Sequence, residues 1–185
     1  MNTYNIGDKM DDLDVYLKSR HDFVNQFQLL YTYKQLGKES KVNSLIDELY
    51  QELKQEQLFL NAPCRKFVQE VFSHKISLSG SKWTFEIECN SDEDYQRNLF
   101  LSDNILLNIY HKWMNHIVNE IDELDTHIGL IIEQEFVTLI MSAKGITINE
   151  NEIKQIFSNY NIEIISYNQE ICELEIFINI NELEV

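Results

Sequence analysis

The sequence is poor in the residues that break a chain or cross-link it. It contains one proline and five glycines in 185 residues, too few for long disordered linkers, so we expect a folded chain throughout. Its three cysteines, Cys64, Cys89 and Cys172, are widely spaced and form no CxxC pair. This pattern predicts neither a zinc site nor a disulfide framework, and it is typical of a reducing compartment.

Basic residues are also scarce. Lys and Arg number 15 against 31 Asp and Glu, which gives a net charge of −16, and after Glu120 the only Lys or Arg residues are Lys144 and Lys154. Such a field repels phosphate groups, so we expect no binding to nucleic acid or to membranes. The first residues are polar rather than a signal peptide, and no apolar run approaches the roughly 18 residues of a membrane span. We therefore expect a cytoplasmic protein.

What the chain does have is apolar material for a core. Apolar residues make up 44% of it and aromatic residues 11%. The length accommodates a small helical element followed by an α/β unit of roughly 110 residues. We expect a helical hairpin over residues 1–60 and an α/β domain over residues 61–185.

Apolar residues at helical spacing predict two antiparallel helices in the first part. The first should run from Asp11 or Asp12 to about Leu36, with Gly37 as its C-cap and Ser40 as the N-cap of the second. The apolar stripes are Leu13, Tyr16, Leu17, Phe23, Val24, Phe27, Leu30 and Tyr31 on the first helix and Val42, Leu45, Ile46, Leu49 and Leu53 on the second. The first stripe is broader than the second can cover, so we expect a second copy to cover the rest in a homodimer. A hairpin folded back onto its own C-terminal domain is the alternative.

One histidine stands at the edge of the first apolar stripe. At about 100° per residue, His21 falls on the polar flank, where Asn25 and Gln28 share its face. A structural histidine would lie in the middle of the stripe. Neutral imidazole is a nucleophile that can carry a covalent group, so His21 is the candidate catalytic residue. Asp22 and Arg20 flank it, and Arg20 lies nearer the apolar arc.

The run SRHDFVNQFQL, from Ser19 to Leu29, resembles the phosphoacceptor segment of the sporulation initiation phosphotransferase B family. It is also similar to the histidine box of citrate- and dicarboxylate-type sensor kinases. The resemblance implies a dimer in which paired hairpins form a four-helix bundle, followed by a domain shaped like a histidine-kinase ATPase domain. That family relays phosphoryl groups between the aspartates of two response regulators through one histidine, which here would be His21. Asp22 would orient its ring, and Arg20, Asn25 and Gln28 would support it or contact the partner.

The pattern of the second part predicts an α/β two-layer sandwich, so the fold class of the whole chain is α+β. The period changes from helix to strand and back several times. We expect helices from Pro63, from Tyr95 to Ile121 and from Asn149 to Phe157, and strands at 83–89, 128–134, 136–141, 162–167 and 171–180. Such an order of elements gives helices packed over a mixed sheet.

Parts of this domain resemble the ATP-binding domain of histidine kinases, but the nucleotide-binding residues have been replaced. Asn108 stands where the helix motif would begin, and Lys112 occupies the place of its second Asn. Met141 and Ala143 replace the Asp and the first Gly of the adenine motif. No glycine follows Gly145, although a phosphate cradle needs backbone conformations that glycine allows. We expect no ATP, no tightly bound cofactor and no autophosphorylation, with Mg²⁺ supplied by the partner response regulator.

Two other functions are compatible with the sequence. The chain could be a non-catalytic adaptor that docks a regulator, a kinase or a GTPase through its hairpin, because fold and a short motif do not fix activity. A metal enzyme using His111, His116 and His127 is the weaker alternative. His111 and His116 lie five residues apart, about 140° around a helix, and no carboxylate completes a familiar spacing.

Overall fold

The computed structural model describes residues 12–78, 81–117, 125–145, 149–167 and 171–183, with the backbone alone for residues 12–22 and 167. The chain divides into two compact units, residues 1–51 and 52–185. Helix α2 runs through the boundary, so its first half belongs to the hairpin and its last turns to the second unit.

The hairpin consists of α1 (Asp12–Gln35) and α2 (Glu39–Leu60), as expected. Gly37 ends α1 with a φ of +65°, and the Lys38 and Gly37 N–H groups donate to the carbonyls of Tyr33 and Lys34 at 3.0 and 3.1 Å. These two bonds make a Schellman motif, which needs a left-handed residue. The predicted cap at Ser40 is wrong. Because α2 already begins at Glu39, Ser40 lies inside its first turn.

The second unit is a two-layer sandwich with one five-stranded mixed sheet, which confirms the expected fold class. Its elements are α3 (Arg65–Ser77), β1 (Trp83–Cys89), α4 (Asp92–Ile117), β2 (Asp125–Ile132), β3 (Phe136–Lys144), α5 (Glu150–Ile156), β4 (Asn161–Tyr167), β5 (Ile171–Asn179) and the 3₁₀ turn η1 (Ile180–Glu182). The strand order is β1-β2-β3-β5-β4, with β1 parallel to β2 and all other pairs antiparallel. The expected turn at Asn168-Gln169 lies outside the described residues.

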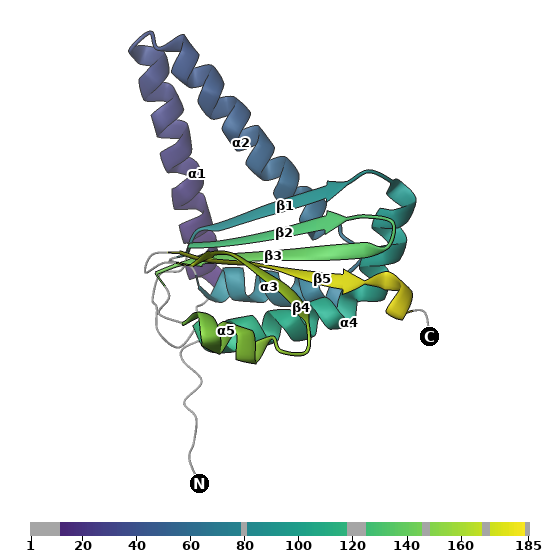
Figure 1. Ribbon diagram of the computed structural model, residues 1–185. Coiled ribbons are helices and arrows are strands. Elements are labelled where there is room, and N and C mark those ends of the chain that lie inside the picture. Colours follow the sequence, from purple (N-terminus) through teal and green to yellow (C-terminus); the bar gives the residue numbers. More distant parts are fainter. Residues whose placement is uncertain (1–11, 79–80, 118–124, 146–148, 168–170, 184–185) are drawn as a thin grey trace. The chain divides into compact units, whose positions relative to one another are not determined.

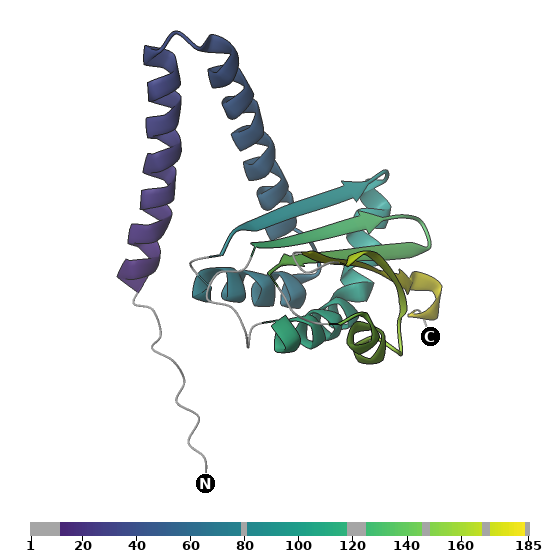
Figure 2. The ribbon, with the colours of Figure 1, turned by 60° about the vertical axis from the view of Figure 1, so that its left-hand side comes forward.

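All three helices α3, α4 and α5 lie on one face of the sheet (Figures 1 and 2). Alternate strand residues point into this layer, and the core includes the fully buried Tyr110 and Trp113 of α4. The last turns of α2 pack against β1, the strand at one edge of the sheet. There the Gln55 Oε1 accepts the Ile87 N–H at 3.0 Å, and the buried Phe59 ring lies 4.7 Å from the Phe85 ring, centroid to centroid.

Helix boundaries differ from the expected ones where a distant or local side chain acts as a cap. The long helix α4 begins at Asp92 rather than Tyr95, because Ser91 Oγ accepts the Asp94 N–H at 3.3 Å. At α5 the expected cap is confirmed, since Asn149 Oδ1 accepts the Glu152 N–H at 2.9 Å.

The start of α3 is set by a carboxylate from another helix. Pro63 was expected as its first residue, which is wrong, because α3 begins at Arg65 and its N-cap Cys64 makes no side-chain cap. Instead Asp103 of α4 accepts the Lys66 and Phe67 N–H groups at 3.1 and 2.9 Å. Burial, and then the nearby Asp103 carboxylate, raises the pKa of the Cys64 thiol to about 12. This thiol is therefore a neutral packing residue.

Replacing Asp103 with Ala is expected to lower the free energy of unfolding by about 1–2 kcal/mol, because two N–H groups at a positive helix end lose their charged acceptor. Asn104→Ala is the matched control, since Asn104 receives only the exposed Lys66 ammonium and should change stability by less than about 0.5 kcal/mol. Urea titration measures both. Equal effects of the two substitutions would contradict the role of Asp103.

Candidate functional site

The five residues singled out on the first helix all lie in α1, which is unbroken from Asp12 to Gln35. Helical geometry therefore places Asn25 one turn and Gln28 two turns after His21 on the same face. Both Asn25 and Gln28 are exposed. The side chains of Arg20, His21 and Asp22 lie outside the described residues, so their contacts stay predictions.

Local sequence explains why this helix is continuous. It contains neither Gly nor Pro, so nothing breaks the hydrogen-bond ladder. The Phe23 and Phe27 rings, one turn apart, contact each other with their centroids at 5.0 Å. This pair stiffens the segment that follows His21.

The apolar arc of α1 is exposed within the single chain. Phe23, Phe27 and Tyr31 have 60%, 59% and 62% of their surface open to solvent, and Leu53 on α2 has 66%. Large aromatic side chains aligned on one helix face are typical of an interaction surface rather than of scattered surface residues. None of the described helices is both long and apolar enough to cross a membrane.

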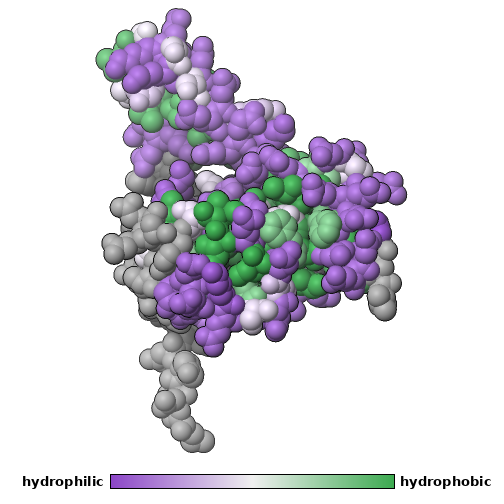
Figure 3. Space-filling model, viewed as in Figure 1, coloured by the Kyte–Doolittle hydropathy of each residue, from purple (hydrophilic) through white to green (hydrophobic). Residues whose placement is uncertain are grey.

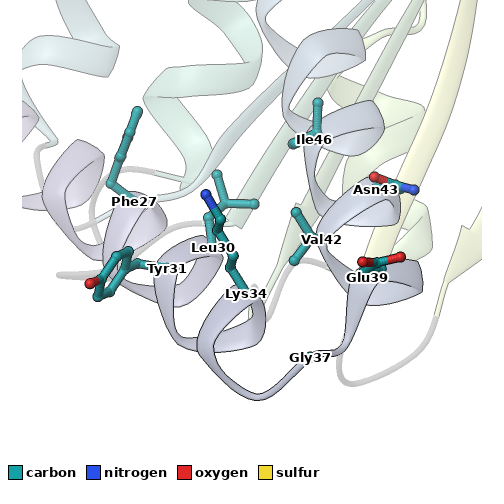
Figure 4. A pocket seen from close by; sticks show the side chains of 9 residues that line it. All are labelled: Phe27, Leu30, Tyr31, Lys34, Gly37, Glu39, Val42, Asn43 and Ile46. Carbon is teal, nitrogen blue, oxygen red and sulfur yellow. The ribbon is translucent and has the colours of Figure 1, made fainter.

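Part of this arc forms one wall of a groove between the two helices, near the turn of the hairpin (Figure 4). The groove has a volume of about 690 Å³ and is lined by Phe27, Leu30, Tyr31 and Lys34 of α1, by Gly37 of the turn, and by Glu39, Val42, Asn43 and Ile46 of α2. Figure 4 shows Leu30 and Val42 reaching into the space between the helices. An apolar floor with charged groups at its rim suits a protein surface as occupant.

The sequence did not single out the polar rim of this groove, which Lys34, Glu39 and Asn43 provide. One signal was present, because Lys34 follows Leu30 and Phe27 at spacings of four and seven residues and so shares their face. The contribution of α2 to the groove depends on how the two helices meet. That geometry is not encoded in either helix alone.

In the second unit, the residues compared in sequence with a nucleotide motif make packing contacts. Met141 and Ala143 are fully buried in β3. The Lys112 ammonium on α4 donates to the Ile156 carbonyl at 3.4 Å and lies 4.9 Å from the Tyr160 ring centroid. Lys112 therefore links α4 to the end of α5 and to Tyr160. Lys112 is the residue compared in sequence with the second Asn of the helix motif.

The three histidines considered for a metal site have separate partners. His111 Nε2 lies 3.1 Å from Glu70 Oε1, His116 Nδ1 lies 2.8 Å from the Lys112 carbonyl oxygen, and His127 Nδ1 lies 3.0 Å from Thr84 Oγ1. Across the described ranges of the chain, no group of three or more His, Cys, Asp or Glu side chains is placed to hold a metal ion. The structure gives the metal-enzyme interpretation no support.

Comparison with known proteins identifies the hairpin. Residues 7–62 match a domain family described as sensor kinase, SpoOB-type, alpha-helical domain. No curated protein matches the chain.

Several solved histidine kinases are similar to the chain at low identity. The nucleotide-free catalytic domain of histidine kinase ThkA is 12% identical with a TM-score of 0.39, over 63% of this chain and 90% of that one. Acinetobacter baumannii histidine kinase AdeS is 12% identical with a TM-score of 0.37, over 87% and 98%. ThkA in complex with response regulator TrrA is 12% identical with a TM-score of 0.36, over 91% and 62%.

Proposed function

Because residues 7–62 match the family described as sensor kinase, SpoOB-type, alpha-helical domain, we propose that the chain is a phosphorelay phosphotransferase. His21 accepts a phosphoryl group from the aspartyl phosphate of one response regulator and passes it to an aspartate of another. The observation that supports this proposal is that His21 lies in the unbroken helix α1, inside the matched segment, and that the apolar side chains that follow it, Phe23 and Phe27, are exposed.

The transfer is a balanced exchange of one bond for another. An unprotonated ring nitrogen of His21 attacks phosphorus in line, a nitrogen–phosphorus bond forms, the acyl phosphate bond breaks, and the aspartate carboxylate of the first regulator leaves. The second regulator reverses the step with its own carboxylate as nucleophile. Acyl phosphate and phosphoramidate are both high-energy species, so the transfer can run in either direction. Positioning and the regulator's Mg²⁺ supply most of the rate enhancement.

Neighbouring side chains of α1 have distinct supporting roles. Asp22 orients the imidazole, and Asn25, exposed one turn on, donates a hydrogen bond to the transferring group or to the partner backbone. Gln28 extends this polar face by another turn. Lys18 and Arg20 place positive charge next to His21 in an otherwise acidic chain, which favours approach of the acidic phosphorylation pocket of a regulator.

The phosphoryl group does not come from ATP bound to this chain. Methionine at position 141 has no oxygen to accept the hydrogen bonds of the adenine amino group, and its side chain is fully buried. The Lys112 ammonium is no metal ligand, and it is held by the Ile156 carbonyl and the Tyr160 ring. With the nucleotide-binding residues replaced in these ways, the second unit is a structural or docking domain.

The functional form is a homodimer whose paired hairpins make a four-helix bundle. The exposed Phe23, Phe27 and Tyr31 and the apolar floor of the groove support this proposal, because a second hairpin would remove them from water. His21 would then lie on the rim of the bundle, where a regulator reaches it.

Mixing the protein with a ³²P-phosphorylated response regulator is expected to move label onto this chain. The product should be acid-labile and alkali-stable, as phosphohistidine is. It should be absent in His21→Gln, which cannot form the nitrogen–phosphorus bond. His116→Gln is the matched control, because His116 is a histidine on α4 with an exposed side chain, and this variant should be labelled like the wild type.

Two outcomes of that assay oppose the proposal. Label transferred from ATP alone would contradict the account of the second unit. Full regulator binding with no label on the chain would favour the adaptor function instead.

Sedimentation equilibrium is expected to give twice the 22.0 kDa of one chain at micromolar concentration. Phe27→Glu should weaken the dimer by on the order of 10²–10³-fold, because two buried rings at about 2 kcal/mol each are lost. Phe100→Glu is the matched control, since Phe100 on α4 is also exposed, at 70%, but lies outside the hairpin. A wild-type mass of one chain, or equal effects of the two substitutions, would rule out a hairpin-mediated dimer.

A further inference from the structure

The sheet has a second face, opposite the layer of α3, α4 and α5 (Figures 1 and 2). Strand alternation places Ile131, Ile140 and Phe177 near its centre, and all three are half-buried. Ile131 and Phe177 lie on the two sides of Thr138 in the sheet register. In the view of Figure 3, apolar residues gather over the strands between hydrophilic ones.

Glycine gives this apolar centre its shape. Gly129 lies opposite Ile140 across the β2–β3 pair. A Cβ at position 129 would come within 3.2 Å of the Ile140 Cβ, so the Ile140 side chain occupies the space that a side chain on β2 would fill. The Ile140 side chain therefore covers β2 at Gly129 and belongs to the apolar centre of the face.

Carboxylates surround the apolar centre. The outward positions carry Glu86 and Glu88 on β1, Glu163 on β4, and Glu173 and Glu175 on β5. In the described strands the only basic residues are His127, which lies 3.6 Å from Glu86, and Lys144, which lies 4.0 Å from Asp125. The negative charge of the face is therefore largely uncompensated.

Two of these carboxylates oppose each other directly. Glu163 and Glu175 are register partners in the antiparallel β4–β5 pair. Like charges directly opposite each other on one face destabilise a sheet, so the free protein bears a repulsion that a positive partner would relieve.

We propose that this outer sheet face docks a segment of a partner protein that presents Lys or Arg on both sides of one or two apolar side chains. Charge complementarity selects this occupant, because cations would meet the surrounding carboxylates while the apolar groups cover Ile131, Ile140 and Phe177. A second copy of the chain would bring like charges together, at a net charge of −16 per chain. Beside Phe177, a hollow of about 350 Å³ that Phe136 and Asn161 also line leaves room for an apolar anchor.

The test uses the full-length chain and a synthetic twelve-residue peptide with arginines flanking a Leu-Phe pair, next to a peptide with serine in place of each arginine. Methyl NMR should show shifts at the δ-methyls of Ile131 and Ile140 with the arginine peptide, and much weaker ones with the serine peptide. In Glu86→Lys/Glu175→Lys, binding of the arginine peptide should weaken at least about tenfold. Asp47→Lys/Glu52→Lys on α2 carries the same charge change and should stay within about twofold.

A fold readout accompanies the binding measurement. In Glu86→Lys/Glu175→Lys, the Glu175→Lys substitution replaces a like charge opposite Glu163 with an opposite one. The melting temperature of this variant should therefore be equal to or above that of the wild type. A loss of binding would then reflect the changed charge and not unfolding. Equal weakening in the two variants, equal affinity for the two peptides, or shifts confined to the hairpin would overturn the proposal. So would Ile131 and Ile140 methyls already shielded from a soluble paramagnetic agent in the free chain, because the hairpin or a second copy would then cover the face.

Discussion

In the proposed relay, helix α1 has to satisfy two opposing demands on its surface. Its apolar arc, with Phe23, Phe27 and Tyr31 around 60% exposed in the single chain, needs a partner surface to leave water. A histidine that exchanges phosphoryl groups must instead remain open to a second protein, because in-line attack needs access to a ring nitrogen. We propose that His21 meets both demands because the helical spacing of α1 predicts its imidazole on the flank of the arc rather than in its middle.

The hairpin was largely predictable because its signals are local. Apolar spacing and Gly37 define the two helices, and the observed φ of +65° at Gly37 is what a left-handed C-cap requires. The failure at Ser40 is equally informative. Its side chain is a good cap, but α2 starts at Glu39, two residues before the start that a cap at Ser40 implies, so Ser40 lies inside the first turn. The groove was not predictable, since it depends on how two helices meet.

In the second unit, all five strands were predicted, although β2 spans Asp125–Ile132 rather than 128–134. The missed start of α4 depends on the local Ser91 cap, whereas the missed start of α3 depends on a distant residue. Asp103 fixes the start of α3 from 36 and 37 positions away. The buried Asn98 side chain donates to the Glu133 and Gln134 carbonyls at 2.7 and 3.3 Å and so ties the β2–β3 turn to α4. No pattern within either segment reveals such a pair. The predicted loss of a nucleotide motif rests on residue types alone and stays a prediction, and the structure adds that Met141 and Lys112 have packing partners.

The most direct measurement of the central claim is transfer between two response regulators in the presence of a trace amount of this protein. The first regulator begins fully phosphorylated and the second unphosphorylated, with no ATP present. If His21 is a relay, the chain acts catalytically, and one molecule should equilibrate phosphate between many regulator molecules. If label reaches the second regulator no faster than without the protein, or only when the protein is present in stoichiometric amounts, the relay account is contradicted.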